Sequence, residues 1–333
     1  MAAIAALKNF TASSHCSRDQ CHGGGAGLSH APRGLCRLFS AAAFLVLALA
    51  GCDDGGAVTY APAFAASPDA TIVEYVFGVH PLHNPENLHR VYGPLVGYLN
   101  ERLGGPVLRL EASVSYAAFD AKLYAGKFDL ALPNPYQTVR SLEHGYRVFG
   151  KMGDDHNFRG IILVRRDSGI QRVEDLRGKP ISYPAPTALA ATMMPQYYLQ
   201  SHGLDVMRET ESLYVGSQES SIMNVYLGTS AAGATWPPPW QSFAEQRPDV
   251  AAELEVRWRT DPLPNNGLVA RNDLPPELLR RIGEALFTLH QSEDGRAILA
   301  RMALSRFEPA DDDSYASVRA FLERFSRSVR PID

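Results

Sequence analysis

The sequence predicts an α/β protein of two lobes, and three observations carry this prediction. Short apolar or β-branched runs alternate along the chain with segments whose apolar residues recur at helical spacing. The 333 residues are too many for one small core, and 45% of them are hydrophobic against 20% charged. Gly, Pro and Cys are modest in number, which excludes collagen-like, disordered and disulfide-scaffold proteins. Strands alternating with helices indicate largely parallel sheets covered by helices on both faces.

The N-terminal segment has the pattern of a signal peptide. Arg33 and Arg37 precede an uncharged run over 38–50, which is too short to span a bilayer. The run ends in Leu-Ala-Gly-Cys at 49–52, which resembles the lipobox of bacterial lipoproteins. This resemblance implies a signal peptide over 1–51, a lipidated Cys52 and anchoring to the inner membrane, with 52–70 as a tether. The alternatives are an uncleaved anchor or a chance match. The other three cysteines precede Cys52 and would be lost on cleavage.

Segments of both lobes follow in order. The first lobe is expected to comprise 71–165 and 260–333, and the second 166–259. Apolar and β-branched runs predict strands at 71–79, 107–110, 128–132, 147–151, 158–165, 180–183, 211–215, 231–235, 254–259 and 267–270. Helical spacing predicts helices at 88–99, 116–125, 135–144, 173–176, 187–201, 218–227, 275–290, 295–303 and 314–326. The stretch around Asp261-Pro262-Leu263-Pro264 is expected to cross back to the first lobe.

One helix start has the features of an anion site. Pro184-Ala185-Pro186 keeps the chain extended, and Thr187 is a good N-cap, so the N–H groups of Ala188, Leu189 and Ala190 are expected to project unpaired. Free amides at a positive helix end bind tetrahedral anions without a formal cation. The alternative is a plain cap exposed to water. Pro195 is expected to kink this helix.

The order of several motifs resembles that of the phosphonate, phosphite and phosphate binding proteins of ABC importers. These motifs are Gly-Val-His-Pro at 78–81, Gly-Lys-Phe-Asp-Leu-Ala at 126–131, Arg-Arg-Asp-Ser-Gly-Ile at 165–170, Asp-Leu-Arg-Gly-Lys at 175–179 and a Pro-x-x-Thr helix start. The resemblance covers 71 to about 315. It implies the type II periplasmic-binding-protein fold, in which two α/β lobes joined by two crossings close on a ligand between them.

The resemblance also implies site residues. Tyr116 falls where the family has a ligand-contacting tyrosine, although a core aromatic is an equal alternative. The family's second tyrosine aligns with Pro133, so Asn134 or Tyr136 is expected to replace it, at the carboxyl end of a strand. The family's Ser-Thr-Ser-Gly loop corresponds to Thr-Ala-Leu-Ala at 187–190, which offers fewer hydroxyl donors.

Gln218 and Glu219 stand where the family has a His-Glu pair, or they simply cap a helix. The family's later Asp, which helps hold a ligand ammonium group, is Ala231 here. We therefore expect that 2-aminoethylphosphonate is not preferred, and that Glu219 accepts a proton from a monoprotonated oxyanion.

Two further features have structural alternatives. Trp236 and Trp240 could cover a ligand, but core and hinge packing is favoured. His80, His83 and His89 with Glu86 could suggest a metal site, but surface histidines are the favoured interpretation. No metal or other cofactor is expected.

The predicted function is a lipid-anchored periplasmic substrate-binding protein of an ABC importer for a small phosphorus oxyanion, monomeric and working with an ABC permease. The alternative is an accessory protein that presents an oxyanion to a membrane sensor histidine kinase. An enzyme is not expected, because no nucleophile elbow, P-loop or dinucleotide fingerprint is present and Glu219 alone supports one thinly. The net charge of -4 without a polybasic run argues against a nucleic-acid partner.

Overall fold

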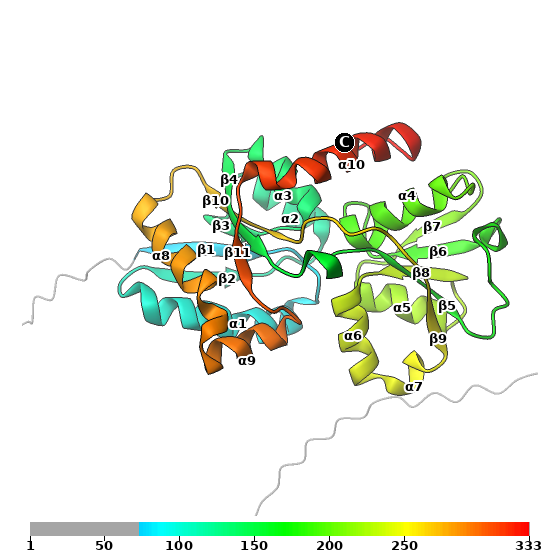
Figure 1. Ribbon diagram of the computed structural model, residues 1–333, viewed down its shortest axis with the longest axis horizontal. Helices are drawn as coiled ribbons and strands as arrows, with labels where there is room; N and C mark the ends of the chain where they lie inside the picture. Colours follow the sequence, from blue (N-terminus) through cyan, green and yellow to red (C-terminus); the bar gives the residue numbers. More distant parts are fainter. Residues whose placement is uncertain (1–72, 333) are drawn as a thin grey trace, which may run out of the picture. The chain divides into compact units, whose positions relative to one another are not determined.

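Two β-sheets organise the chain in the computed structural model, which describes residues 73–332 (Figure 1). The predicted signal peptide, Cys52 and the tether lie outside these residues. The first sheet has the order β11-β4-β10-β3-β1-β2. Its strands are β1 (Glu74–Val79), β2 (Val107–Glu111), β3 (Leu130–Leu132), β4 (Tyr146–Met152), β10 (Gly267–Arg271) and β11 (Phe307–Pro309).

The second sheet has the order β7-β6-β8-β5-β9. Its strands are β5 (Ile161–Arg165), β6 (Pro180–Tyr183), β7 (Glu211–Tyr214), β8 (Ala232–Thr235) and β9 (Leu254–Arg259). We call each sheet with its helices a lobe. Because β5 pairs with β8 and β9, residues 161–165 belong to the second lobe. The expected end of the first lobe at residue 165 is therefore wrong, and the chain first crosses between β4 and β5, over 153–160.

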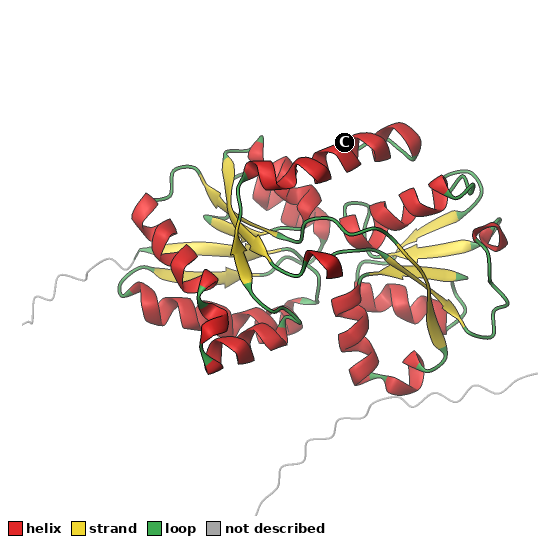
Figure 2. Cartoon of the chain, in the orientation of Figure 1, coloured by secondary structure: helices red, strands yellow, loops and turns green. Residues whose placement is uncertain are grey.

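Helices lie on both faces of each sheet (Figure 2). The first lobe contains α1 (Pro85–Leu103), α2 (Tyr116–Tyr124), α3 (Pro135–Leu142), α8 (Pro276–Phe287), α9 (Glu293–Arg301) and α10 (Ala316–Ser328). The second contains α4 (Met194–Ser201), α5 (Gln218–Tyr226), α6 (Pro237–Gln246) and α7 (Pro248–Ala251). None of the helices within 73–332 is long and apolar enough to cross a membrane.

The sheets are mixed rather than largely parallel. β1 runs parallel to β2 and β3, and β6 runs parallel to β7 and β8, as a strand-helix-strand pattern requires. β10 is antiparallel to β3 and β4, and β5 is antiparallel to β8 and β9. β5 and β10 come directly after a crossing, so no helix of the lobe they enter reverses the chain before them. β11 is also antiparallel to β4, but it follows α9.

The second crossing, over 260–266, lies beside the first. The N–H of Thr260 donates to the Gly160 carbonyl at 2.9 Å, and the N–H of Leu263 donates to the Phe158 carbonyl at 3.0 Å. At the first-lobe end, the N–H of Met152 donates to the Asn266 carbonyl at 2.9 Å. The crossings therefore form one hydrogen-bonded pair that connects the two lobes.

One large apolar cluster extends across the boundary between the lobes. It includes Phe119 and Leu132 of the first lobe, together with Leu189, Met193 and Trp236 of the second. The second lobe has two smaller clusters on the two faces of its sheet. Burial of shared apolar surface therefore brings the carboxyl ends of β1 and β3 close to the start of the helical segment after β6.

Candidate functional site

A small pocket lies where the two lobes meet. It is narrow: about 220 Å³ of space lies between its walls, and this volume includes open solvent. Its lining residues are His80, Tyr116, Asn134, Phe158, Ala188, Leu189, Ala190, Ala191, Gln218, Trp236 and Asn266. Of the expected ligand-binding residues, the pocket therefore brings together Tyr116, Asn134, Ala188, Leu189 and Gln218.

The helix start at this pocket differs from the expected one. The helical segment begins at Leu189 with a π-helical turn, Leu189–Met193, and continues as α4. Thr187 does not cap it: the residue before the first turn is Ala188, whose N–H donates to the Ala185 carbonyl at 3.2 Å. The N–H groups of the first turn of a helix have no acceptor within that helix. Here that turn lines the pocket, so its positive end lies at the site.

Pro195 does not simply kink a regular helix. It stands in the first turn of α4, directly after the π-helical turn. Because proline has no N–H to donate, the preceding backbone is free to adopt the wider turn. The sequence therefore located the irregularity correctly but not its form.

Tyr116 and Gln218 approach each other from opposite lobes. Ser115 caps α2 and places the Tyr116 side chain at the start of that helix, where it is buried. Gln218 begins α5 behind the Ser217 cap, and its Nε2 donates to the Tyr116 hydroxyl at 3.5 Å. Thr235 Oγ1 donates to Gln218 Oε1 at 2.8 Å, which directs the amide nitrogen toward Tyr116. Burial raises the pKa of Tyr116, so its hydroxyl keeps its proton and can donate it to an anionic oxygen.

Asn134 joins the lobes through its side chain. Its Oδ1 accepts from the Gln137 N–H at 3.1 Å, which caps α3, and its Nδ2 donates to the Thr187 carbonyl at 3.0 Å. Tyr136, two residues further, does not line the pocket and packs in the first-lobe part of the large apolar cluster. Of the two residues expected to replace the family's tyrosine, Asn134 lines this pocket and Tyr136 does not.

Thr187 contacts the first lobe instead of the pocket. Its Oγ1 donates to Asp120 Oδ2 at 3.3 Å, and Gln137 Nε2 donates to Asp120 Oδ1 at 2.5 Å. Burial raises the pKa of Asp120 to about 6, although both hydrogen bonds oppose the shift. Thr187 therefore belongs to the contacts that hold the lobes together.

Glu219 lies outside the pocket. Its side chain is exposed and lines a neighbouring groove with His83, Asn87, Ser242 and Arg247. Glu219 does not line the pocket between the lobes, so its expected role as acceptor of the ligand's proton stays a prediction. Consecutive side chains on a helix are about 100° apart, so when Gln218 points toward the pocket, Glu219 points toward solvent.

Apart from the predicted residues and Ala190, whose N–H was expected at the anion site, five residues line the pocket: His80, Phe158, Ala191, Trp236 and Asn266. His80 was expected at the surface, but it is only 2% exposed. Trp236 is buried against Phe158, with ring centroids 5.5 Å apart, which agrees with the favoured packing role and also makes it a wall of the site. The Gly-Val-His-Pro motif at 78–81 was a signal for His80, because it places His80 directly after the last residue of β1.

No group of three or more His, Cys, Asp or Glu side chains within 73–332 is arranged to hold a metal ion. The lining residues carry no carboxylate, lysine or arginine. Burial lowers the pKa of His80 to about 4, so the imidazole is neutral near pH 7. The pocket therefore offers polar donors in an uncharged, buried setting, which suits a small anion held by hydrogen bonds.

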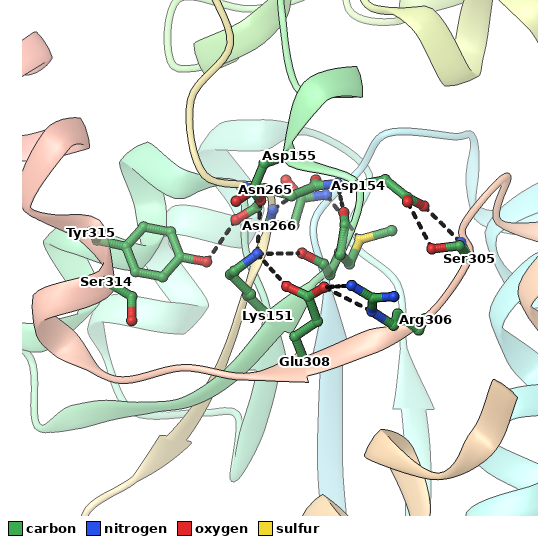
Figure 3. Close-up of polar contacts among 12 residues, drawn as sticks. Lys151, Asp154, Asp155, Asn265, Asn266, Ser305, Arg306, Glu308, Ser314 and Tyr315 are labelled. Atoms are coloured by element: carbon green, nitrogen blue, oxygen red, sulfur yellow. Dashed lines mark hydrogen bonds and ion pairs between the residues drawn. The ribbon is translucent and has the colours of Figure 1, made fainter. Parts of the chain in front are cut away.

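A polar network stabilises the crossings beside the pocket (Figure 3). Lys151 Nζ lies 2.8 Å from Asp155 Oδ1 and 2.9 Å from Glu308 Oε2. Asn265 Nδ2 donates to the Gly153 carbonyl at 2.7 Å, and the Tyr315 hydroxyl donates to the Asn265 carbonyl at 2.6 Å. These bonds tie both crossings to the first lobe, next to Asn266.

Comparison with known proteins identifies similar chains. The family model described as "ABC transporter, phosphonate, periplasmic substrate-binding protein" matches residues 77–315. The phosphonates-binding periplasmic protein of Escherichia coli K12 is 18% identical over 254 residues, which cover 73% of this chain and 74% of that protein.

Two solved structures have the same fold. The binding component of a phosphonate ABC transporter from Pseudomonas aeruginosa has a TM-score of 0.71 and 18% identity, covering 77% of this chain and 87% of its own. A Prochlorococcus marinus protein in complex with methylphosphonate has a TM-score of 0.70 and 17% identity, covering 76% and 98%. The arrangement of two mixed sheets agrees with the type II periplasmic-binding-protein fold expected from the sequence.

Proposed function

Because this chain belongs to the family of periplasmic substrate-binding proteins of phosphonate ABC transporters, we propose that it delivers a small phosphorus oxyanion to an ABC permease. The ligand is held in the pocket between the lobes. One observation carries this proposal: hydrogen-bond donors from both lobes, Tyr116 and Gln218, meet beside a helix start in a pocket without formal charge. A ligand bonded to both lobes favours their closed arrangement, which is how such proteins signal occupancy.

The ligand's substituent is small and uncharged. The pocket is narrow, and Phe158, Trp236 and the alanines of the first helical turn give it apolar walls. No lining carboxylate is available to pair with an ammonium group, so a 2-aminoethyl substituent would bury an unpaired cation. We propose methylphosphonate, phosphite or phosphate as the ligand class, in preference to 2-aminoethylphosphonate. The methylphosphonate complex of the similar Prochlorococcus protein supports this choice.

We further propose that the protein acts on the periplasmic side of the inner membrane, attached through a lipid on Cys52 and as a monomer. The sequence Leu-Ala-Gly-Cys at 49–52 after an apolar run supports the anchor. Replacement of Cys52 by serine should release the protein from membranes and abolish labelling with a fatty-acid probe. Retention of both properties in the variant would contradict the anchor.

Calorimetric titration of the purified protein tests the proposed ligand class, with methylphosphonate, phosphite, phosphate, 2-aminoethylphosphonate and sulfate as the titrants. We expect binding of at least one of the first three and much weaker binding of the last two. Tyr116→Phe removes one donor to the anion and should weaken binding about tenfold or more. Tyr183→Phe is the matched control, because the Tyr183 hydroxyl is buried without a hydrogen-bond partner and does not line the pocket. Binding of none of the phosphorus oxyanions would overturn the proposal.

A further inference from the structure

The orientation of the His80 ring is defined by a hydrogen bond. His80 follows the last residue of β1, and its Nδ1 lies 2.9 Å from the carbonyl oxygen of Leu132, the last residue of β3. A carbonyl oxygen can only accept, so Nδ1 carries the proton. In the neutral ring Nε2 then has a lone pair and no hydrogen. Burial, which lowers the pKa of His80 to about 4, keeps the ring in this form near neutral pH.

The groups around His80 leave that lone pair without a donor. From α2, the rings of Tyr116 and Phe119 face the His80 ring, with centroids 6.1 and 6.5 Å from the centroid of the imidazole. From β3 it meets the Leu132 carbonyl, and His83 in its own loop is the only titratable group that disfavours its positive charge. Within 73–332 no side chain or N–H donates to Nε2, although His80 lines the pocket.

A second acceptor lies in the same pocket. Asn266 is fully buried at the first-lobe end of the second crossing, and its Oδ1 has no hydrogen-bond partner within the described chain. Its Nδ2 faces Met152 Sδ at 3.4 Å. The pocket therefore combines donors for an anion with unsatisfied acceptors at His80 and Asn266. An unsatisfied buried acceptor is costly, so the ligand that fits must also donate a hydrogen.

We propose that His80 makes the site selective for an oxyanion that carries one acidic hydrogen, by accepting a P–O–H hydrogen bond at Nε2. This inference rests on the proposed function and deepens it. The singly protonated phosphonate satisfies the donors with its charged oxygens and the imidazole with its hydroxyl. A sulfonate of the same shape has no hydrogen to donate, so its oxygen meets the Nε2 lone pair and is rejected.

The selectivity has a pH dependence with a defined sign. Above the second pKa of a phosphonate, the fraction of free ligand in the singly protonated form falls tenfold for each pH unit. The affinity should therefore fall about tenfold for each unit above that pKa, because the bound complex keeps the proton that free ligand has lost. Methylphosphonate and methanesulfonate are matched probes, since they differ mainly in the hydroxyl hydrogen.

The test is calorimetric titration of the purified protein with both probes between pH 6 and pH 9. For the wild type we expect methanesulfonate to bind at least about a hundredfold more weakly than methylphosphonate at pH 6. His80→Gln places an amide that can donate a hydrogen bond at the Nε2 position. The ratio of the methylphosphonate affinity to the methanesulfonate affinity should therefore fall at least tenfold, and the methylphosphonate affinity should depend less on pH. His83→Gln is the matched control, because His83 lines the outer grooves and not this pocket, and it should behave as wild type.

A methylphosphonate affinity that is constant from pH 6 to pH 9 would overturn the inference, as would equal wild-type affinity for both probes. The wild-type measurement decides the question even if His80→Gln fails to fold, and His80→Asn, which retains an amide donor for the Leu132 carbonyl, provides a second variant. Failure of every phosphorus oxyanion to bind at any pH would instead overturn the proposed function itself. The two failures are thereby distinguished.

Discussion

The side-chain amide of Asn134 donates to the carbonyl oxygen of Thr187 at 3.0 Å, which bonds a first-lobe side chain to the second-lobe backbone. Asn134→Asp keeps the oxygen that caps α3 but replaces the donor with a second acceptor. We predict that it weakens methylphosphonate binding about tenfold or more, because the closed arrangement loses a hydrogen bond and gains a repulsion. Calorimetric titration measures the change. Asn84→Asp is the control: Asn84 caps α1 in the same way through the Asn87 N–H. Equal losses in both variants would assign the effect to capping.

Asp120 contributes a pH dependence to stability. Its raised pKa of about 6 means that the native state favours the protonated carboxyl, so its contribution is greatest below about pH 4 and is lost as the pH rises through 6. Asp120→Asn removes the buried charge and should stabilise the protein at pH 8 by on the order of 2 kcal/mol, with a much smaller gain at pH 4. Urea unfolding at both pH values measures this difference. Asp313→Asn, at a nearly fully exposed side chain, should change stability at neither pH.

The parts of the fold predicted from the sequence are those encoded locally. Apolar and β-branched runs located the strands that become β1, β6 and β8, and helical spacing located α2 and α5. The family resemblance pointed to Tyr116 and Gln218, and the structure brings both side chains to the pocket. Strand direction was less predictable, because β5 and β10 pair with strands of a lobe that the chain has just entered.

The parts that could not be predicted depend on contacts between distant segments. The burial of His80 results from packing of α2 and from the Leu132 carbonyl, 52 residues later in the chain. The sequence around His80 and His83 does not indicate that α2 or the Leu132 carbonyl will contact His80. Thr187 similarly had the sequence of an N-cap, but its hydroxyl bonds to Asp120, 67 residues earlier, and the helix begins two residues later.

Gly160 allows the first crossing to pack against the helix start. A Cβ at this position would lie 2.6 Å from the Ala190 carbonyl oxygen and 2.7 Å from Pro195 Cδ. We predict that Gly160→Ala destabilises the protein by about 1–3 kcal/mol and also weakens ligand binding, since the backbone that must move lines the pocket. Gly97→Ala is the control, because nothing lies within 4 Å of its added Cβ and alanine favours the interior of α1. It should be neutral or slightly stabilising. Thermal unfolding and calorimetry test both variants, and an unchanged affinity in Gly160→Ala would contradict the coupling of crossing and pocket.

Lys151 braces the crossings by bridging Asp155 and Glu308 (Figure 3). Its hydrogen bond lowers the pKa of the Glu308 carboxyl. The bridge therefore contributes stability above the ordinary pKa of a glutamate, and this contribution is lost as the pH falls through the lowered value. We predict that Lys151→Met costs about 1–2 kcal/mol at pH 7 and progressively less toward pH 3. Urea unfolding across this range measures the change.

Arg306 provides the matched comparison, because it also pairs with Glu308 but more than half of its side chain is exposed. Water screens an exposed pair, so Arg306→Gln should cost less than about 0.5 kcal/mol. A double-mutant cycle of Lys151→Met with Glu308→Gln should recover a coupling free energy at pH 7 that declines at pH 3, which loss of packing by the lysine stem would not produce. Equal costs for the Lys151 and Arg306 variants would show instead that Lys151 acts through surface charge alone, and that its partly buried bridge does not help to hold the crossings beside Asn266.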